Sequence, residues 1–478
     1  MTPTEEQQAA IELSLTTEDL TIEALAGCGK TSTLKLISDA KRNSSGAYIA
    51  FNKAIVVEAA KKFPSNVQCS TAHSLAFQAI GRRYASKLNS SRQLYRETAR
   101  LLGIYNAEEI EVEGTKIKLP VNEQVHAVKG VVERFCQGGD DQFSSYHIPV
   151  PDLLRPWGRQ YREAIAPLVL PVAERMWQDI QNPKGQVAFS HNHYLKMWQL
   201  SRPKINADFI LFDEAQDANG VMLAIVQNQE AQKIFVGDSF QQIYSWNGAV
   251  NAMAKTSGNR TWLTESWRFG QGVADVANQM LARLDSPAML IGRGPDSVVG
   301  PLRHAEAMLY RTNGACIAAM VEAHDLRRRF HLVGGVTQLE AFTRAARKLI
   351  NRENPMHPEL NCFESWADVV TFAETDEADG DLPRMVKMIE THGAARILAI
   401  LSSNETDPRD ADVVVSTAHK SKGCEWDSVI IGSDFGSELG EEEQRLLYVA
   451  VTRAKKALDH TAVKGHFTLK GSENHECA

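Results

Sequence analysis

The chain has 478 residues, 43% hydrophobic and 23% charged, and this ordinary globular composition excludes a disordered or collagen-like protein. At about 100 to 200 residues per domain, the length predicts roughly three or four domains. The formal net charge of -7 argues against a protein that coats duplex DNA by bulk electrostatics, although a local basic groove stays compatible with nucleic-acid binding.

Neither a membrane span nor a disulfide framework is expected. No stretch approaches the roughly 18 apolar residues of a span, and the first residues lack the plan of a secretory signal. The cysteines are odd in number and never form a Cys-x-x-Cys pair, which predicts reduced thiols and no zinc site. They are Cys28, Cys69, Cys136, Cys316, Cys362, Cys424 and Cys477. We therefore expect an intracellular protein, cytoplasmic in a prokaryote or phage and nuclear in a eukaryote.

In the first part of the chain, short apolar segments typical of strands alternate with segments that suit helices. The expected strands are residues 20–26, 47–51, 208–212 and 233–236, and the expected helices are 32–40 and 53–62. Strands that alternate with helices predict a parallel sheet whose active groups lie at the carboxyl ends of the strands.

Residues 84–204 have a different texture, rich in Arg, Glu, Gln and Trp, and predict a helical insertion without a strand series. A second alternating region starts near Trp262, and acidic stretches at 374–381 and 404–412 bracket a small second insertion. The strands expected in this region are 307–310, 331–333, 412–416 and 428–432. The predicted parts are a first core (1–84 and 204–262), a helical insertion (85–203), a second core (263–340 and 405–478) and a small insertion (341–404).

A glycine-rich loop between the first strand and the first helix has the core of a P-loop, Gly29-Lys30-Thr31. In such a loop the backbone N–H groups cradle phosphate oxygens, Lys30 neutralises the β and γ phosphates, and the Thr31 hydroxyl ligates magnesium. The nucleotide-binding residues would be Ala26, Gly27, Cys28, Gly29, Lys30, Thr31 and Ser32. Ala24 occupies the position of the first glycine, and an ordinary turn before a helix is the alternative for the loop alone.

The apolar strand Phe209–Phe212 delivers two adjacent carboxylates, Asp213 and Glu214. Asp213 can hold magnesium, directly or through water, while Glu214 can orient and deprotonate an attacking water. The pair alone would suit a solvated turn, but together with the P-loop it indicates an ATPase. Phosphoryl transfer also requires positive charge on the γ-phosphate, so we expect arginines from elsewhere in the chain.

These motifs resemble those of a known family. Asp213-Glu214-Ala215-Gln216-Asp217 resembles the D-E-x-Q-D signature of superfamily 1 helicases of the UvrD/Rep type, which often begin their P-loop with alanine. Within that family, Ala47–Lys53, Phe63–Val67 and His193–Lys196 are most similar to the helicase part of the F-box DNA helicases. Since Gln7 lies almost at the start, we expect no room for the F-box. The resemblance implies an α/β fold of two tandem RecA-like P-loop NTPase domains with parallel sheets, each carrying a mostly helical insertion.

The resemblance assigns further residues to the implied cofactors, ATP and Mg²⁺. Gln7 is similar to the glutamine that reads adenine in this family, and Gln241 to the one that senses the γ-phosphate. Arg268 and Arg453 stand where two arginines reach the γ-phosphate, and Glu425 where a glutamate contacts the ribose.

A second set is implied to meet single-stranded DNA: Phe51, Asn52, Thr71, His73, Tyr244, Trp246 and His419. Aromatic side chains suit a motor that steps without reading sequence, because every base has a face on which a ring can stack. Each aromatic could instead be a core residue, and a lone histidine is more often structural. Asn247 replaces an arginine usual in close relatives, and Trp267 stands where tyrosine is common.

The implied function is an ATP-dependent translocase on single-stranded DNA and a DNA helicase, with 3′–5′ polarity, that couples Mg-ATP hydrolysis to stepping and duplex unwinding. One alternative is a DNA-stimulated translocase that displaces proteins such as recombinase filaments without productive unwinding. Another is a nucleotide-gated binding module without catalysis. The implied partners are single-stranded DNA, junctions of single and double strands, and proteins of recombination or repair.

Overall fold

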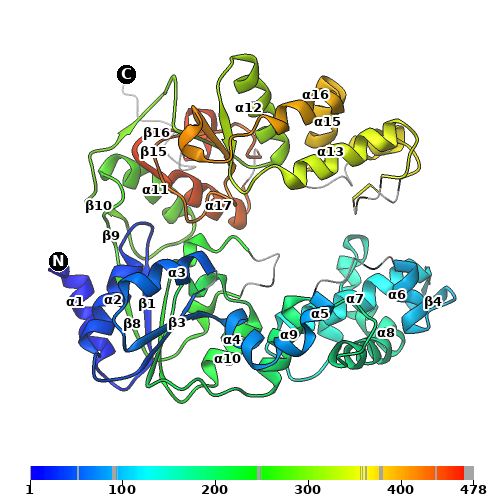
Figure 1. Cartoon of the computed structure of the whole chain (residues 1–478), viewed down its shortest axis with the longest axis horizontal. Coiled ribbons are helices and arrows are strands. Elements are labelled where there is room, and N and C mark those ends of the chain that lie inside the picture. Colours follow the sequence, from blue (N-terminus) through cyan, green and yellow to red (C-terminus); the bar gives the residue numbers. More distant parts are fainter. Residues whose placement is uncertain are drawn as a thin grey trace. The chain divides into compact units, whose positions relative to one another are not determined.

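The computed structural model describes residues 2–50, 53–88, 93, 95–244, 248, 250–355, 357, 359–360, 363–375, 381–436 and 439–467 (Figure 1). The chain forms two compact units. Met1–Glu23 and Lys30–Thr261 make up the first, and Ala24–Gly29 and Trp262–Ala478 the second. Each unit contains one six-stranded sheet.

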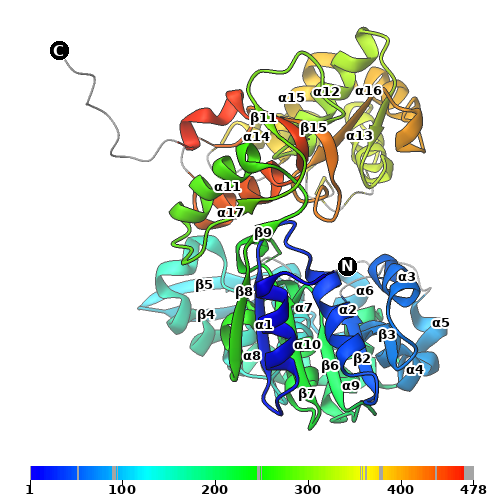
Figure 2. The same cartoon turned by 90° about the vertical axis from the view of Figure 1, so that its left-hand side faces the viewer.

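The sheet of the first unit has the strand order β3-β2-β6-β7-β1-β8. All the pairs from β3 to β1 are parallel, and β6 and β7, which come late in this unit's sequence, lie between the early strands β2 and β1 (Figure 2). The strands are β1 (Leu20–Ala24), β2 (Gly46–Ala50), β3 (Val67–Thr71), β6 (Phe209–Phe212), β7 (Gln232–Gly237) and β8 (Asn259–Leu263). Since β1, β6 and β7 are neighbours, the residues that follow them share one edge of the sheet.

Burial explains why these segments form strands. Every residue of β1, β2 and β6 is buried, as expected for parallel strands covered on both faces. The connecting helices are α1 (Glu5–Ser14), α2 (Lys30–Ala40), α3 (Lys53–Lys62), α4 (Ala72–Ala79) and α10 (Gly220–Gln227). Strands β1, β2, β6 and β7 lie within two residues of the expected ones, whereas β3 and β8 were not among the expected strands.

The helical insertion is helical as predicted, with one exception. Its helices lie together at one side of the first sheet in Figure 1. They are α5 (Ala85–Leu88), α6 (Tyr95–Leu102), α7 (Val121–Gln137), α8 (Gly158–Gln181) and α9 (His191–Leu200). The exception is an antiparallel hairpin of β4 (Glu108–Val112) and β5 (Thr115–Leu119). In the hairpin, buried Ile110 and Val112 alternate with exposed glutamates, and Gly114 supplies the left-handed turn (φ 76°).

The sheet of the second unit has the order β11-β16-β15-β12-β14-β13, with every pair parallel. Its strands are β11 (Val298–Val299), β12 (Ala307–Tyr310), β13 (Phe330–Leu332), β14 (Val413–Thr417), β15 (Trp426–Ile431) and β16 (Ala454–Asp459). Its helices include α11 (Gln271–Arg283), α12 (Asn313–Asp325) and α17 (Glu441–Val451), and a separate short pair joins β9 (Glu265–Ser266) to β10 (Ile291–Gly292). The predicted α/β class with two parallel sheets is therefore confirmed.

The expected small insertion packs into the second unit. It contributes α13 (Thr337–Ile350), α14 (Trp366–Ala373), α15 (Leu382–His392) and α16 (Ala394–Ser402). Their buried side chains, such as Phe342, Trp366 and Ile397, share one hydrophobic cluster with α12, β13 and β14. These four helices therefore build part of the core of the second unit. The boundaries of the four predicted parts stay a prediction.

Polar contacts reinforce this packing at the start of α12. Asp434 accepts hydrogen bonds from the backbone N–H groups of Arg311 and Thr312, both at 2.9 Å, and pairs with Arg384 of α15 at 3.1 Å. Asp381, which precedes α15, accepts from the backbone N–H of Asn313 and Gly314. Carboxylates at a helix start are stabilised by its free N–H groups and dipole.

None of the helices in the described part of the chain combines the length and the apolar character that crossing a membrane requires.

Replacing Asp434 tests how much these contacts hold α15 to the core. Asp434→Ala leaves two backbone donors without their acceptor, so we expect the free energy of unfolding to fall by about 2–4 kcal/mol. Arg396→Ala, which removes an exposed pair with Asp325, is the control and should cost less than about 1 kcal/mol. Urea unfolding followed by tryptophan fluorescence measures both. Equal losses in the two variants would contradict the assigned role of Asp434.

Candidate active site

The P-loop turns from β1 into α2 through two glycines in the left-handed region, Gly27 (φ 77°) and Gly29 (φ 78°). Left-handed residues between right-handed ones turn successive backbone N–H groups toward one point, where an anion fits. Helix α2 starts at Lys30, so its free N–H groups face the same place. The loop therefore has the donors that a nucleotide phosphate requires.

Residues 24–29 of the loop belong to the second unit, where hydrogen bonds hold their backbone. The N–H of Leu25 donates to the Leu263 carbonyl at 3.0 Å, and that of Ala26 to the Tyr448 hydroxyl at 3.1 Å. A Cβ on Gly27 would lie 2.4 Å from the Ser266 hydroxyl, so only glycine fits there. The Cys28 side chain is buried.

Asp213 follows β6 directly and is 3% exposed. Its Oδ2 accepts a hydrogen bond from the Tyr48 hydroxyl at 2.6 Å, and its Oδ1 accepts from the backbone N–H of Glu214 at 2.9 Å. Burial and the nearby Glu214 carboxylate raise the pKa of Asp213 to about 6, while the positive charge of Lys30 opposes the rise. Asp213 is therefore within electrostatic reach of the P-loop lysine, as a magnesium ligand beside the phosphates has to be.

Glu214 has a left-handed backbone (φ 53°), which is uncommon for a residue other than glycine and costs about 1–3 kcal/mol. This conformation breaks the strand direction immediately after Asp213. The Glu214 carboxylate accepts a hydrogen bond from the Gln216 amide at 2.5 Å. The two adjacent carboxylates therefore take different partners and different degrees of burial.

A continuous run of hydrogen bonds joins Glu214 to Gln241. The Gln216 amide that donates to Glu214 also accepts, through its oxygen, from the backbone N–H of Asp238 at 3.1 Å. The Asp238 carboxylate in turn accepts from the Gln241 side-chain amide at 2.7 Å. A Cβ on Gly237 would lie 2.3 Å from the Gln216 oxygen, so the run depends on glycine at the end of β7.

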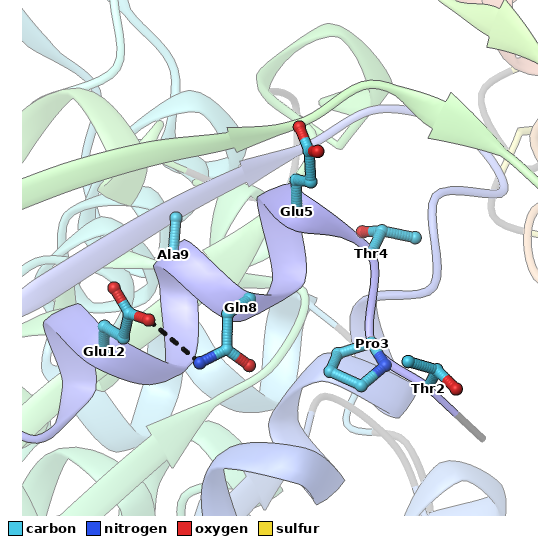
Figure 3. Close-up of a pocket in the computed structure, with 7 residues that line it drawn as sticks. All are labelled: Thr2, Pro3, Thr4, Glu5, Gln8, Ala9 and Glu12. Atoms are coloured by element: carbon cyan, nitrogen blue, oxygen red, sulfur yellow. Dashed lines mark hydrogen bonds between the residues drawn. The ribbon is translucent and has the colours of Figure 1, made fainter.

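Gln7 lies inside the protein, on α1. Its side-chain oxygen accepts from the Thr4 backbone N–H at 3.1 Å, and its amide donates to the Thr33 hydroxyl of α2 at 3.2 Å. The neighbouring Gln8 instead lines an open hollow and donates to Glu12 at 2.9 Å (Figure 3). Gln7 is thus tied to the helix that starts at the P-loop.

In the second unit, Arg268, Glu425 and Arg453 lie close together, where the end of α17 meets the segment before β15. Arg268 donates to the Glu425 carboxylate at 2.9 Å and to the Thr452 carbonyl at 3.1 Å. Arg453 is 2% exposed and donates to the carbonyls of Val449 and Cys424. The structure therefore brings the three residues assigned to ATP in this unit together.

The residues assigned to DNA have mixed surroundings. Phe51, Asn52 and Trp246 lie outside the described residues. The Thr71 hydroxyl caps α4 by accepting from the Ser74 N–H at 3.0 Å. His73 packs edge-on against Tyr194 of the helical insertion.

The remaining two candidates for DNA binding are half-buried. Burial raises the pKa of Tyr244 to about 12, with help from the carboxylates of Asp217 and Glu214. Burial and the charge of Arg311 lower the pKa of His419 to about 4, so this imidazole is neutral at pH 7. Neutral rings of this kind suit stacking or a single hydrogen bond more than pairing with phosphate.

Three residues near the site were not assigned a role from the sequence. Tyr48 bonds to Asp213 and Gln216 to Glu214, as described above. Glu23, the residue before Ala24, is 4% exposed, accepts from the Ser239 hydroxyl and pairs with Arg260 at 2.8 Å. A buried glutamate in an apolar strand is a signal that could have been found, whereas nothing in the sequence distinguishes Tyr48 from a core aromatic.

Comparisons with known proteins fit this geometry. The model of the AAA domain matches residues 7–247, half of the chain, and the model of the UvrD-like helicase C-terminal domain matches residues 412–458. The chain belongs to the AAA domain family, and residues 412–458 are similar to the C-terminal domain of UvrD-like helicases. An AAA domain implies nucleotide binding, and the P-loop described above lies within the matched residues.

Three curated relatives are DNA helicases. F-box DNA helicase 1 of Gallus gallus is 29% identical over 91% of this chain and 46% of its own length. F-box DNA helicase protein 1 of Schizosaccharomyces pombe is 30% identical over 95% of this chain and 57% of its own length. A probable DNA helicase of Mycoplasma pneumoniae is 28% identical over 52% of this chain and 42% of its own length. The chain thus spans about half the length of the relatives it matches, and the predicted resemblance to F-box DNA helicases is confirmed.

The raised pKa of Asp213 predicts a stability cost at neutral pH. A folded-state value near 6, above the ordinary 3.8, means that the folded protein holds this proton more tightly than the unfolded chain does. The stability that this provides is present below pH 4 and is lost as the pH rises through 6. Asp213→Asn should therefore stabilise the nucleotide-free protein at pH 7.5 by about 1–3 kcal/mol, with a smaller gain at pH 5.

Thermal unfolding of the nucleotide-free variant at the two pH values checks this expectation. Asp407→Asn is the control, because Arg409 lowers the pKa of Asp407 to about 2 and its loss should not stabilise the protein. A gain for Asp213→Asn that is equal at pH 5 and pH 7.5 would contradict the assigned pKa.

Proposed function

We propose that this protein is a UvrD-like helicase, an ATP-driven motor that translocates on single-stranded DNA with 3′–5′ polarity and unwinds duplexes. The observation that carries the proposal is the hydrogen-bonded run from Glu214 through Gln216 and Asp238 to Gln241. It links the residue suited to activate water with the residue assigned to sense the γ-phosphate. A motor needs such a link because hydrolysis has to change its conformation.

Each residue has a definite part in the proposed reaction. The backbone N–H groups of Gly27–Thr31 bind the phosphates, and Lys30 neutralises their charge. Asp213 and Thr31 would hold Mg²⁺, which would supply charge neutralisation at the phosphates. Glu214 orients the attacking water and accepts its proton.

The two arginines of the second unit complete the proposed mechanism. Arg268 and Arg453 stabilise the charge on the γ-phosphate, while Glu425 contacts the ribose. In the structure Glu425 holds Arg268 at 2.9 Å, so nucleotide binding would require this pair to rearrange. We propose that ATP binds between the two RecA-like domains and that alternation of the bound and released states drives stepping.

DNA is the proposed substrate because the matched relatives are DNA helicases and the chain supplies residues suited to its bases. Phe51, Tyr244 and Trp246 would stack on bases, at about 1–3 kcal/mol for each base. Asn52, Thr71, His73 and His419 would contact the strand beside them. We also propose that the chain has four parts, two cores and two insertions. The second insertion shares its hydrophobic cluster with the second core.

An unwinding assay with duplexes that carry a 3′ or a 5′ single-stranded tail tests this proposal. We expect ATP-dependent unwinding of the 3′-tailed duplex at least about tenfold faster than of the 5′-tailed one. Lys30→Ala is the control and should remove unwinding, because the phosphates lose their cationic partner.

Two outcomes of that assay separate the alternatives. DNA-stimulated ATP hydrolysis without unwinding, together with displacement of a recombinase filament, would indicate a protein-displacing translocase and not a helicase. Absence of DNA-stimulated phosphate release would contradict the motor and favour a binding module without catalysis.

A further inference from the structure

Tyr48 is a core residue of β2, and its hydroxyl contacts Asp213, the residue that follows β6. Its side chain is fully buried and its ring lies 4.8 Å from that of Phe63. Strand β2 is the neighbour of β6, and Tyr48 is paired in register with Leu211, two residues before Asp213. The hydroxyl reaches Oδ2 of Asp213 at 2.6 Å, a short bond between a hydroxyl and a carboxylate.

The direction of this hydrogen bond follows from the two groups. Burial and the charge of Asp213 raise the pKa of Tyr48 well above its ordinary value, so the phenol keeps its proton and donates. Glu214 donates its backbone N–H to the other oxygen, Oδ1. The carboxylate is thus held by one donor from the neighbouring strand β2 and one from the turn after β6, and each oxygen keeps a lone pair for a further partner.

We propose that Tyr48 is a positioning residue for the magnesium ligand Asp213, which it holds in the orientation that receives the metal. The proposal rests on the proposed function, in which Asp213 is a metal ligand. Partners that orient a ligating side chain are a general feature of metal sites, and their loss lowers metal affinity by about 10–100-fold.

A purely structural role would not need the hydroxyl at this place. Phenylalanine would fill the same space beside Phe63 without a buried polar group. Tyr84 shows the structural arrangement, because its buried hydroxyl donates to a backbone carbonyl, that of Gln181, also at 2.6 Å. Tyr48 differs in that its acceptor is the side chain assigned to the metal.

The test separates the binding of metal from that of nucleotide. Tyr48→Phe removes the hydroxyl and keeps the ring, and its unfolding temperature is measured first. A fluorescent ADP analogue is then titrated in EDTA, and Mn²⁺ is titrated into the complex and followed by electron paramagnetic resonance. We expect the metal-free Kd for the nucleotide to stay within about twofold of wild type, and the Kd for Mn²⁺ to rise about tenfold.

Two control variants make the result specific. Tyr84→Phe loses a partly buried hydrogen bond of equal length and should leave the Kd for Mn²⁺ unchanged. Asp213→Asn should raise that Kd at least as much as Tyr48→Phe does. Replacement of Tyr48 by para-aminophenylalanine, which keeps an N–H donor at the same place, should restore it to within about threefold of wild type.

The possible failures are distinguishable. If Tyr48→Phe binds Mn²⁺ as wild type does while Asp213→Asn does not, the positioning role is wrong and the proposed metal site stands. If Asp213→Asn also binds as wild type does, the metal role in the proposed function is wrong. Should Tyr48→Phe fail to fold, a para-aminophenylalanine variant that folds but binds Mn²⁺ more than tenfold weaker would overturn the inference.

Discussion

A carboxylate that is buried at the end of a parallel strand has to be held by hydrogen-bond donors, and the candidate site depends on how Asp213 meets this requirement. The Tyr48 hydroxyl donates to its Oδ2, and the Glu214 backbone N–H donates to its Oδ1. Because Asp213 is 3% exposed, its carboxylate depends on these protein donors. Burial and the neighbouring Glu214 carboxylate raise its pKa, so a cation beside it would stabilise the charged form.

The rest of the first unit's site follows from this group. Asp213 follows the last residue of β6, and the left-handed backbone of Glu214 then turns the second carboxylate toward Gln216. Gln216 uses both ends of its amide, one for Glu214 and one for the backbone of Asp238 after β7. A movement of Gln241 would therefore shift Glu214 through these hydrogen bonds. Strain at Glu214 is consistent with a residue held for chemistry at the expense of stability.

Much of the fold could be predicted from the sequence because burial on both faces leaves a clear apolar pattern, as in Phe209–Phe212 and Val413–Thr417. The P-loop and the carboxylate pair could be predicted because their residue types follow from their chemistry. Phosphate binding needs glycines followed by lysine. The hairpin at Glu108–Leu119 was missed because its alternation is short and lies among helices. Tyr48 could not be predicted, because its role depends on β2 and β6 being neighbours, and these strands are at least 159 residues apart in the chain (209 − 50).

The proposed mechanism requires Glu214 to activate the attacking water, and a single-turnover experiment on Glu214→Gln measures this step alone. The amide keeps the shape of the side chain but cannot accept a proton. We expect ATP and Mg²⁺ to bind within about threefold of wild type while the cleavage rate in the bound complex falls by about 10²–10⁴-fold. Cleavage of bound ATP by this variant at the wild-type rate would exclude Glu214 as the base.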